Sequence, residues 1–146
     1  MTTATYNKFN LFTQDVCEGV HNFKTGGQTF NVMLTNTAPV ATNHLYSDVS
    51  GTELASGGGY TTGGVASAMS DSTSSGTEKV LATNVTFTGS GGGMGPFRYV
   101  IIYNVTATTP LKPLVCWFDY GSSISLTAGD TFTVSFDGTN GLFQLT

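Results

Sequence analysis

Apolar and polar residues alternate along much of this chain with a period of two, which is the period of a strand buried on one face. Phe30, Val32 and Leu34, for example, are separated by polar neighbours. Half-buried or short strands are predicted on this basis at 28–34, 64–69, 81–87, 123–126, 131–136 and 142–145. The alternation therefore predicts a largely β protein.

Two further segments, Phe97–Thr106 and Leu114–Tyr120, are apolar at both parities. A strand with this pattern is typically central in its sheet and buried on both faces. We therefore expect Ile101 to lie in the core, together with Phe132 from the alternating segment 131–136.

Helical periodicity is confined to the N-terminal part of the chain. Phe9, Phe12, Val16 and Val20 recur at steps of three and four residues, which predicts an amphipathic helix over 8–21. One or two short helical turns are expected near His44–Val49.

Strands do not alternate regularly with helices, so a parallel α/β sheet is not expected. We predict an all-β fold, an antiparallel β-sandwich of jelly-roll type with one short N-terminal helix. Residues 1–146 are expected to form a single domain, and its non-strand parts are the arm and helix 1–22 and the long loops 35–62 and 89–95. Tight turns are predicted at the glycines 57–59 and 63–64, a surface turn at 71–76 and a hairpin turn at 137–141.

Composition narrows the class of protein. Charged residues are only 10% of the chain, the net charge is −4 and the pI is about 4.7. Nucleic-acid binding needs clustered Lys and Arg, so it is not expected. No apolar run approaches the ~20 residues that span a bilayer, and the N-terminus has no apolar signal segment. We therefore expect a protein made in a cytosol, without membrane association.

Candidate chemistry starts with the two histidines, His21 and His44. Asp48 follows His44 by four residues, so these two are a candidate base and orienting carboxylate of a hydrolase. Hydroxyls are abundant throughout the chain, but no G-x-S-x-G motif follows an apolar strand. The favoured interpretation of His44 is a solvated loop histidine, and no catalytic residue is expected.

The two cysteines lie far apart in sequence. Cys17 and His21 have the i, i+4 spacing of half a zinc site, but no C-x-x-C motif or second Cys/His pair completes it. We expect both cysteines to be reduced, with Cys116 in the core. The glycine-rich segment Gly91–Gly95 lacks the lysine of a phosphate-binding loop. Neither a metal nor a cofactor is expected.

Residue type also suggests a carboxylate pair and an aromatic binding platform. Asp119, Asp130 and Asp137 are candidates for a glycosidase carboxylate pair. The favoured alternatives are an Arg98–Asp119 ion pair between adjacent central strands and a turn role for Asp137. Four aromatic residues are candidates for a platform that binds a sugar or peptide: Tyr99, Tyr103, Trp117 and Tyr120. Packing in the core is the favoured role for them.

An ordered series of sequence blocks resembles a group of short virion structural proteins of tailed bacteriophages. The blocks are Asn31–Pro39, Gly59–Gly64, Gly95–Asn104, Leu114–Ser123 and Gly129–Val134. The resemblance covers most of the chain from about residue 8. It implies a non-enzymatic structural role, as a capsid decoration (cement) protein or a small head- or tail-attached protein, and it carries over no catalytic or ligand residues.

We therefore expect a capsid decoration protein that is made in the host cytoplasm and located in the virion. Its expected partners are the major capsid protein, other virion proteins and further copies of itself, most simply as a trimer. The alternatives are a tail or head-fibre component and a carbohydrate-binding domain that recognises the host surface. The segment before Tyr6 and the loops Thr35–Thr62 and Gly89–Gly95 are expected to make the intersubunit contacts.

Overall fold

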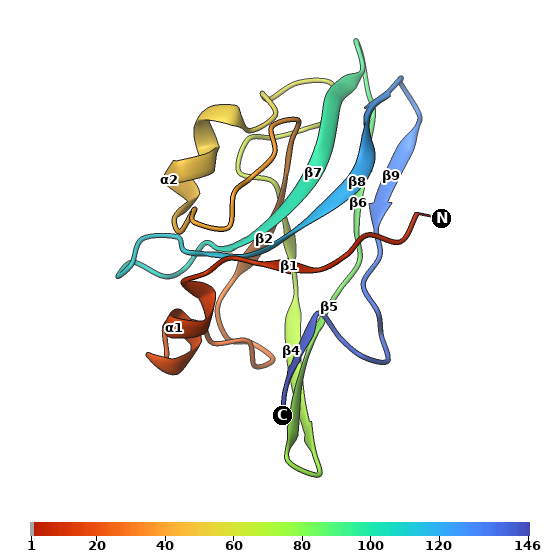
Figure 1. The fold of residues 1–146 in the computed structure, drawn as a ribbon. Helices are drawn as coiled ribbons and strands as arrows, with labels where there is room; N and C mark the ends of the chain where they lie inside the picture. The colour runs from red at the N-terminus through yellow and green to blue at the C-terminus, as the bar shows by residue number, and fades with distance from the viewer. Residues whose placement is uncertain (1) are drawn as a thin grey trace.

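The structure is a computed structural model that describes residues 2–146 (Figure 1). Its elements are β1 (Asn7–Lys8), α1 (Phe12–Cys17), β2 (Phe30–Thr35), α2 (Tyr46–Val49), the 3-10 helix η1 (Ser50–Thr52), β3 (Val65–Ser67), β4 (Met69–Ser74), β5 (Thr77–Ala82), β6 (Val85–Thr88), β7 (Met94–Asn104), β8 (Leu114–Leu126), β9 (Thr131–Val134) and β10 (Phe143–Leu145). The strand pairings are antiparallel. The predicted all-β antiparallel fold is thereby confirmed.

A five-stranded sheet in the order β1-β8-β7-β2-β3 forms the centre of the molecule. Ile102 of β7 lies opposite Val32 of β2 and Cys116 of β8, and these three side chains enter one core cluster. Ile101 and Met33, one position along on the two strands, enter a second cluster. Because successive side chains of a strand point to opposite faces, the two clusters lie on opposite faces of the sheet. The expected burial of β7 on both faces is confirmed.

The two faces of this sheet are covered differently. A second layer, made of the pair β6-β9 and the three-stranded sheet β10-β5-β4, packs on the first cluster. The segment between β2 and β3, which contains α2, covers the second cluster (Figure 1). The result is a sandwich-like arrangement, and the strand order does not confirm the expected jelly roll.

The N-terminal helix is shorter than the predicted 8–21. Before it, Lys8 pairs with Cys116 in β1, and the neighbouring Phe9 enters the second core cluster. After it, Gly19 adopts a φ of +74°, and the amide of Val20 donates to the carbonyl of Asp15 at 2.9 Å. This is the hydrogen bond of a glycine-terminated helix end, so the apolar period continues beyond the helix itself.

Several strand boundaries also differ from the prediction, three of them by a division, an extension or a fusion of strands. The predicted strand 81–87 is divided into β5 and β6 at Thr83 and Asn84, because the amide of Thr83 donates to Ala68 and the side-chain oxygen of Asn84 accepts from Phe136. β4 continues to Ser74, so the predicted surface turn 71–76 shrinks to two residues of positive φ between β4 and β5. The predicted strands 114–120 and 123–126 are one continuous strand, β8.

The segment 137–141 is a turn but not a hairpin. Asp137 accepts hydrogen bonds from the amides of Thr139 and Asn140, as expected for a turn aspartate. The flanking strands β9 and β10, however, pair with β6 and β5 and not with each other. Of the two predicted core residues, Ile101 is 0% exposed, whereas Phe132 is only partly buried against Phe97.

Candidate functional site

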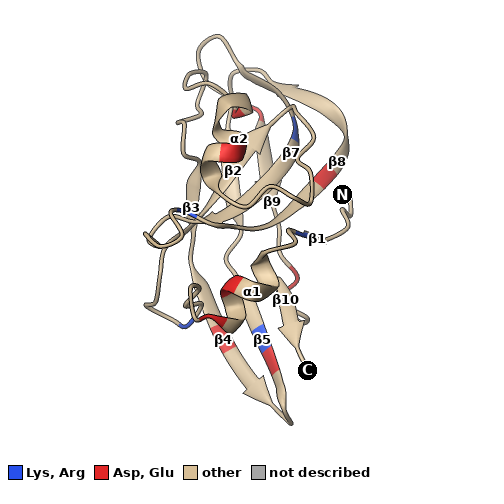
Figure 2. Ribbon diagram, turned by 60° about the vertical axis from the view of Figure 1, so that its left-hand side comes forward, with Lys and Arg blue, Asp and Glu red and all other residues tan. Residues whose placement is uncertain are grey.

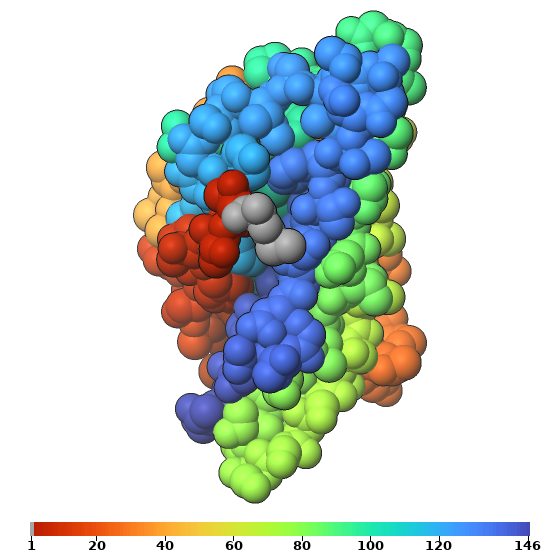
Figure 3. Space-filling model, turned by 90° about the vertical axis from the view of Figure 1, so that its right-hand side faces the viewer, coloured from red at the N-terminus to blue at the C-terminus, as the bar shows by residue number. Residues whose placement is uncertain are grey.

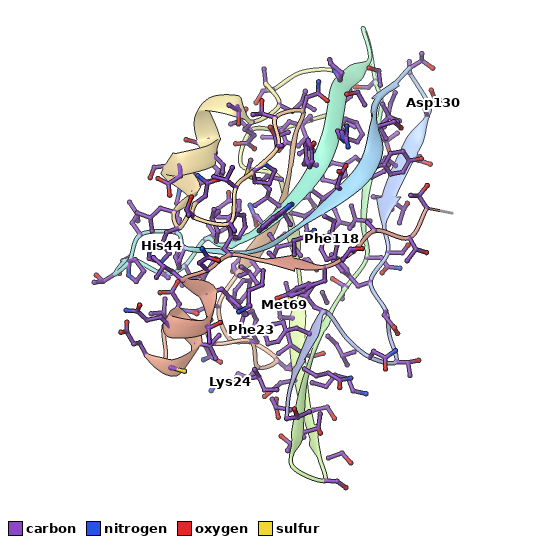
Figure 4. All side chains as sticks on the ribbon, in the orientation of Figure 1. Phe23, Lys24, His44, Met69, Phe118 and Asp130 are labelled. Atoms are coloured by element: carbon purple, nitrogen blue, oxygen red, sulfur yellow. The ribbon has the colours of Figure 1, made fainter. Side chains whose placement is uncertain are left out.

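Both histidines of the chain meet at one buried carboxylate. Asp15, on α1, is 2% exposed. Its Oδ2 atom lies 2.9 Å from Nε2 of His44 and 3.8 Å from Nε2 of His21. The His21 side chain is fully buried, whereas that of His44 is 24% exposed and lies between α1 and α2 (Figure 4). We call these three residues the His-Asp-His cluster.

The environment of His21 defines its protonation state. The side-chain amide of Asn104 donates to Nδ1 at 3.1 Å, so in the neutral ring the proton sits on Nε2, facing Asp15. The rings of Phe12, Phe23 and Phe30 surround the imidazole at centroid distances of 5.4, 5.5 and 5.9 Å. This burial lowers the pKa of His21 to about 4, and His44 adds to the effect. His21 is therefore neutral at physiological pH.

Asp48 does not act as the orienting carboxylate of His44, contrary to the pairing considered from sequence. Its Oδ2 atom accepts from the amides of His44 and Leu45 at 2.8 and 2.9 Å, so it caps the start of α2. These hydrogen bonds hold the pKa of Asp48 below its usual value. Across residues 2–146, no hydroxyl or thiol is hydrogen-bonded to the His44 ring. Within this described part of the chain, the ring of His44 is hydrogen-bonded to the carboxylate of Asp15.

The cysteines take no part in this cluster. Cys17 is exposed and Cys116 is buried, and both are free thiols, as predicted. Burial raises the pKa of the Cys116 thiol. Because α1 ends before His21, the helical spacing of Cys17 and His21 does not bring the two side chains to one face. No group of three or more Cys, His, Asp or Glu within residues 2–146 is placed to hold a metal ion.

The three candidate glycosidase carboxylates are engaged separately. Asp119 receives two hydrogen bonds from the guanidinium of Arg98, at 2.7 and 2.9 Å, and Arg98 holds the pKa of that carboxyl below its usual value. The ion pair predicted between the central strands is thus confirmed. Asp130 binds the amide and hydroxyl of Thr127 within one turn, and Asp137 caps its own turn.

The four candidate platform aromatics do not form one open surface. Tyr103 is 2% exposed. Each of the four has its own packing partner: Tyr103 stacks on Tyr46 at 4.6 Å, Trp117 contacts Phe9 at 4.6 Å, Tyr120 contacts Phe132 at 5.7 Å and Tyr99 lies beneath the guanidinium of Arg98 at 5.2 Å. This arrangement favours packing over ligand binding as their role.

Glu53 links three separate parts of the segment between β2 and β3, and the sequence did not single it out for that role. One carboxylate oxygen accepts from the hydroxyl of Tyr46 at 2.5 Å, and the other accepts from the hydroxyl of Tyr60 and the amide of Gly63, both at 2.6 Å. The hydroxyl of Tyr103, on β7, donates to the carbonyl of Gly63 at 2.7 Å. Burial, aided by the Glu53 charge, raises the pKa of Tyr103 to about 12. We call this network the Glu53 clasp.

The two glycine-rich loops contact each other. A Cβ on Gly58 would lie 1.7 Å from the carbonyl oxygen of Gly93, and Gly58 has a positive φ, as predicted for glycines 57–59. The amide of Ser90 also donates to the carbonyl of Gly58 at 2.9 Å. Since β7 begins at Met94, the predicted loop 89–95 is shorter at its end. Much of the length of both loops is therefore used within the domain.

We expect Glu53→Ala to loosen the segment 36–64, whose parts the carboxylate links together. Two tyrosine hydroxyls and one amide lose a charged acceptor, which should lower the free energy of unfolding by about 1.5–3 kcal/mol. Urea denaturation gives the loss of stability, and hydrogen exchange locates it in this segment. The control is Glu18→Ala, since Glu18 is exposed and its one partner is Gln14. Equal exchange in Glu53→Ala and wild type would contradict the clasp.

Comparison with known proteins finds no matching family model, no matching curated sequence and no matching solved structure. Within residues 2–146, no helix is long and apolar enough to cross a membrane.

Proposed function

We propose that this chain is a non-enzymatic structural protein of a tailed-bacteriophage virion, and in particular a capsid decoration protein. It would bind the outer capsid lattice through contacts with the major capsid protein, as a homo-oligomer such as a trimer. The sequence blocks that resemble short phage virion proteins supply the class. The hydrogen bonds that most acidic side chains accept within the fold support the proposal that the protein is not an enzyme.

One observation carries the non-enzymatic part of the proposal. Of the nine acidic residues, all except Asp71 accept hydrogen bonds within the fold, in caps, turns, the clasp, the ion pair or side-chain pairs. Hydrogen bonds of this kind give a carboxylate a structural role, as a cap, a turn residue or a partner in an ion pair. Asp48, Glu53, Asp130 and Asp137 in particular hold loops and a helix end in place.

The character of the surface supports a role in assembly. Charged residues are few and scattered (Figure 2). Serine, threonine and glycine loops can bind neighbouring proteins by hydrogen bonds without the cost of desolvating charge. The N-terminal segment Thr2–Thr5, mostly exposed, lies on the outside of the molecule against the C-terminal half of the chain (Figure 3). It remains our candidate for an arm that contacts a neighbour.

The test is quantitative mass spectrometry of purified phage particles. We expect this chain at a copy number that scales with the capsid lattice. A copy number set by the single tail would instead favour the alternative of a tail or head-fibre component. Absence of the chain from purified particles would overturn the proposal.

A further inference from the structure

A groove lies between the α1 region and the three-stranded sheet β10-β5-β4. Its volume is about 440 Å³, within the ~300–1,000 Å³ common for binding sites. Phe23 and Lys24, in the segment after α1, form one wall (Figure 4). The sheet forms the floor, and its β4-β5 hairpin projects away from the rest of the molecule (Figures 1 and 3).

The strands that form the floor of the groove carry both apolar and acidic side chains. Cross-strand partners share a face of a sheet. Phe143 of β10 lies opposite Val80 of β5, which lies opposite Asp71 of β4, and Leu145 lies opposite Glu78. Leu145 remains 47% exposed. Val80 itself is only 3% exposed, so an occupant of this groove would meet Leu145 and the partly buried Phe143 beside two carboxylates.

The charges of the groove are unbalanced. Asp71 forms no hydrogen bond or ion pair with any residue of 2–146, and Glu78 is bonded only to the hydroxyl of Thr73. Lys24 is the one cationic residue among the lining side chains. Two carboxylates against one ammonium leave a net negative groove, which complements an apolar side chain next to a cation.

The chain carries such a pair on another part of its surface. Leu111, in the loop between β7 and β8, is 59% exposed, the highest value among the large apolar side chains of residues 2–146. Lys112 follows it with a φ of +50°, in the left-handed region that a lysine seldom adopts. The amide of Lys112 donates to the carbonyl of Ala107 at 2.9 Å, so the loop is a closed turn that presents Leu111. We call Leu111 and Lys112 the knob.

We propose that the knob of one copy enters the groove of a second copy, with Leu111 against Leu145 and the partly buried Phe143. Lys112, whose ammonium lies 5.4 Å from the ring centroid of Tyr46 within its own copy, would then face Asp71 and Glu78 of the second. The proposal rests on the function proposed above and names the contact that would build its homo-oligomer. Knob and groove are different surfaces, so the contact is head-to-tail. Repeated head-to-tail contacts close into a ring or extend as a filament, and a trimer is the ring case.

Light scattering coupled to size exclusion tests this contact with purified protein. Wild type should have an oligomeric mass, and Leu111→Ser and Asp71→Lys should each fall to the 15.3 kDa monomer. Each single variant keeps one intact surface, so an equimolar mixture should form dimers and nothing larger. The double variant Asp71→Lys/Lys112→Asp should regain the oligomer. Matched controls are Val40→Ser, another exposed loop residue, and Ser74→Lys, on the opposite face of β4.

A monomeric wild type, an oligomeric single variant or a mixture that stays monomeric would each overturn the contact. These outcomes are separable from the fate of the proposed function. A monomer that is nevertheless found in purified particles overturns the contact and leaves the virion role. An oligomer that depends on the knob but is absent from particles overturns the virion role and leaves the contact.

Discussion

Ile101→Ala is expected to lower the free energy of unfolding by about 2–5 kcal/mol, the range for truncating a buried aliphatic side chain. Ile101 is 0% exposed at the middle of β7, and it packs in the second core cluster with Phe9, Met33 and Leu114. That cluster lies beneath the segment that contains α2, so the cavity would open under the Glu53 clasp. Urea denaturation measures the loss.

Val65→Ala is the matched control, because Val65 is also a β-branched strand residue but is 42% exposed. Its effect should stay within about 0.5 kcal/mol. A loss below about 1 kcal/mol for Ile101→Ala would mean that β7 is not the central buried strand.

The free energy of unfolding should fall by about 3 kcal/mol as pH decreases from 6.5 to about 4, because of His21. In the folded protein this histidine stays neutral down to about pH 4, whereas in the unfolded chain it binds a proton below its ordinary pKa of 6.5. The unfolded state therefore holds more protons across this window, and the stability is lost from the upper pKa downward. Urea denaturation at a series of pH values measures the slope.

The variant His21→Phe isolates this effect, since a phenyl ring suits the surrounding aromatic side chains but cannot be protonated. Its stability should show a smaller slope between pH 6.5 and 4. The aspartates with lowered pKa values, such as Asp48 and Asp119, lose their contribution progressively from about pH 5 downward, and they do so in both proteins. Equal slopes for wild type and His21→Phe would rule out His21 as the cause.

Burial of the strands was predictable wherever both parities or one parity of a segment were apolar. This applies to β7 and the first half of β8. Placing these two strands side by side also predicted the ion pair between Arg98, on β7, and Asp119, on β8. The helix was overestimated because Phe9, Phe12 and Val16 fit a helical period although Phe9 and Phe12 belong to different core clusters. Periodicity reports that a residue is buried, but not on which side of the sheet.

The His-Asp-His cluster was not predictable, because Asp15 and His44 are 29 residues apart and are joined by tertiary packing alone. The sequence alone suggests partners only a few residues away, Asp48 for His44 and Cys17 for His21. The only sign of the Glu53 clasp in the sequence is that Tyr46 and Tyr60 each lie seven residues from Glu53. In an irregular segment that spacing has no structural meaning until the fold is known.

The pairing of β1 with β8 sets the point in synthesis at which the five-stranded sheet can be completed. Asn7 lies opposite Trp117, 110 residues later in the sequence. The N-terminal strand must therefore wait for most of the chain to leave the ribosome before it finds its partner, and contacts of such long sequence separation form slowly. The chain is rich in threonine and serine and has few long apolar runs. Its unpaired strands should therefore have a low tendency to aggregate with other nascent chains before β1 pairs. We therefore expect β1 to join the five-stranded sheet last.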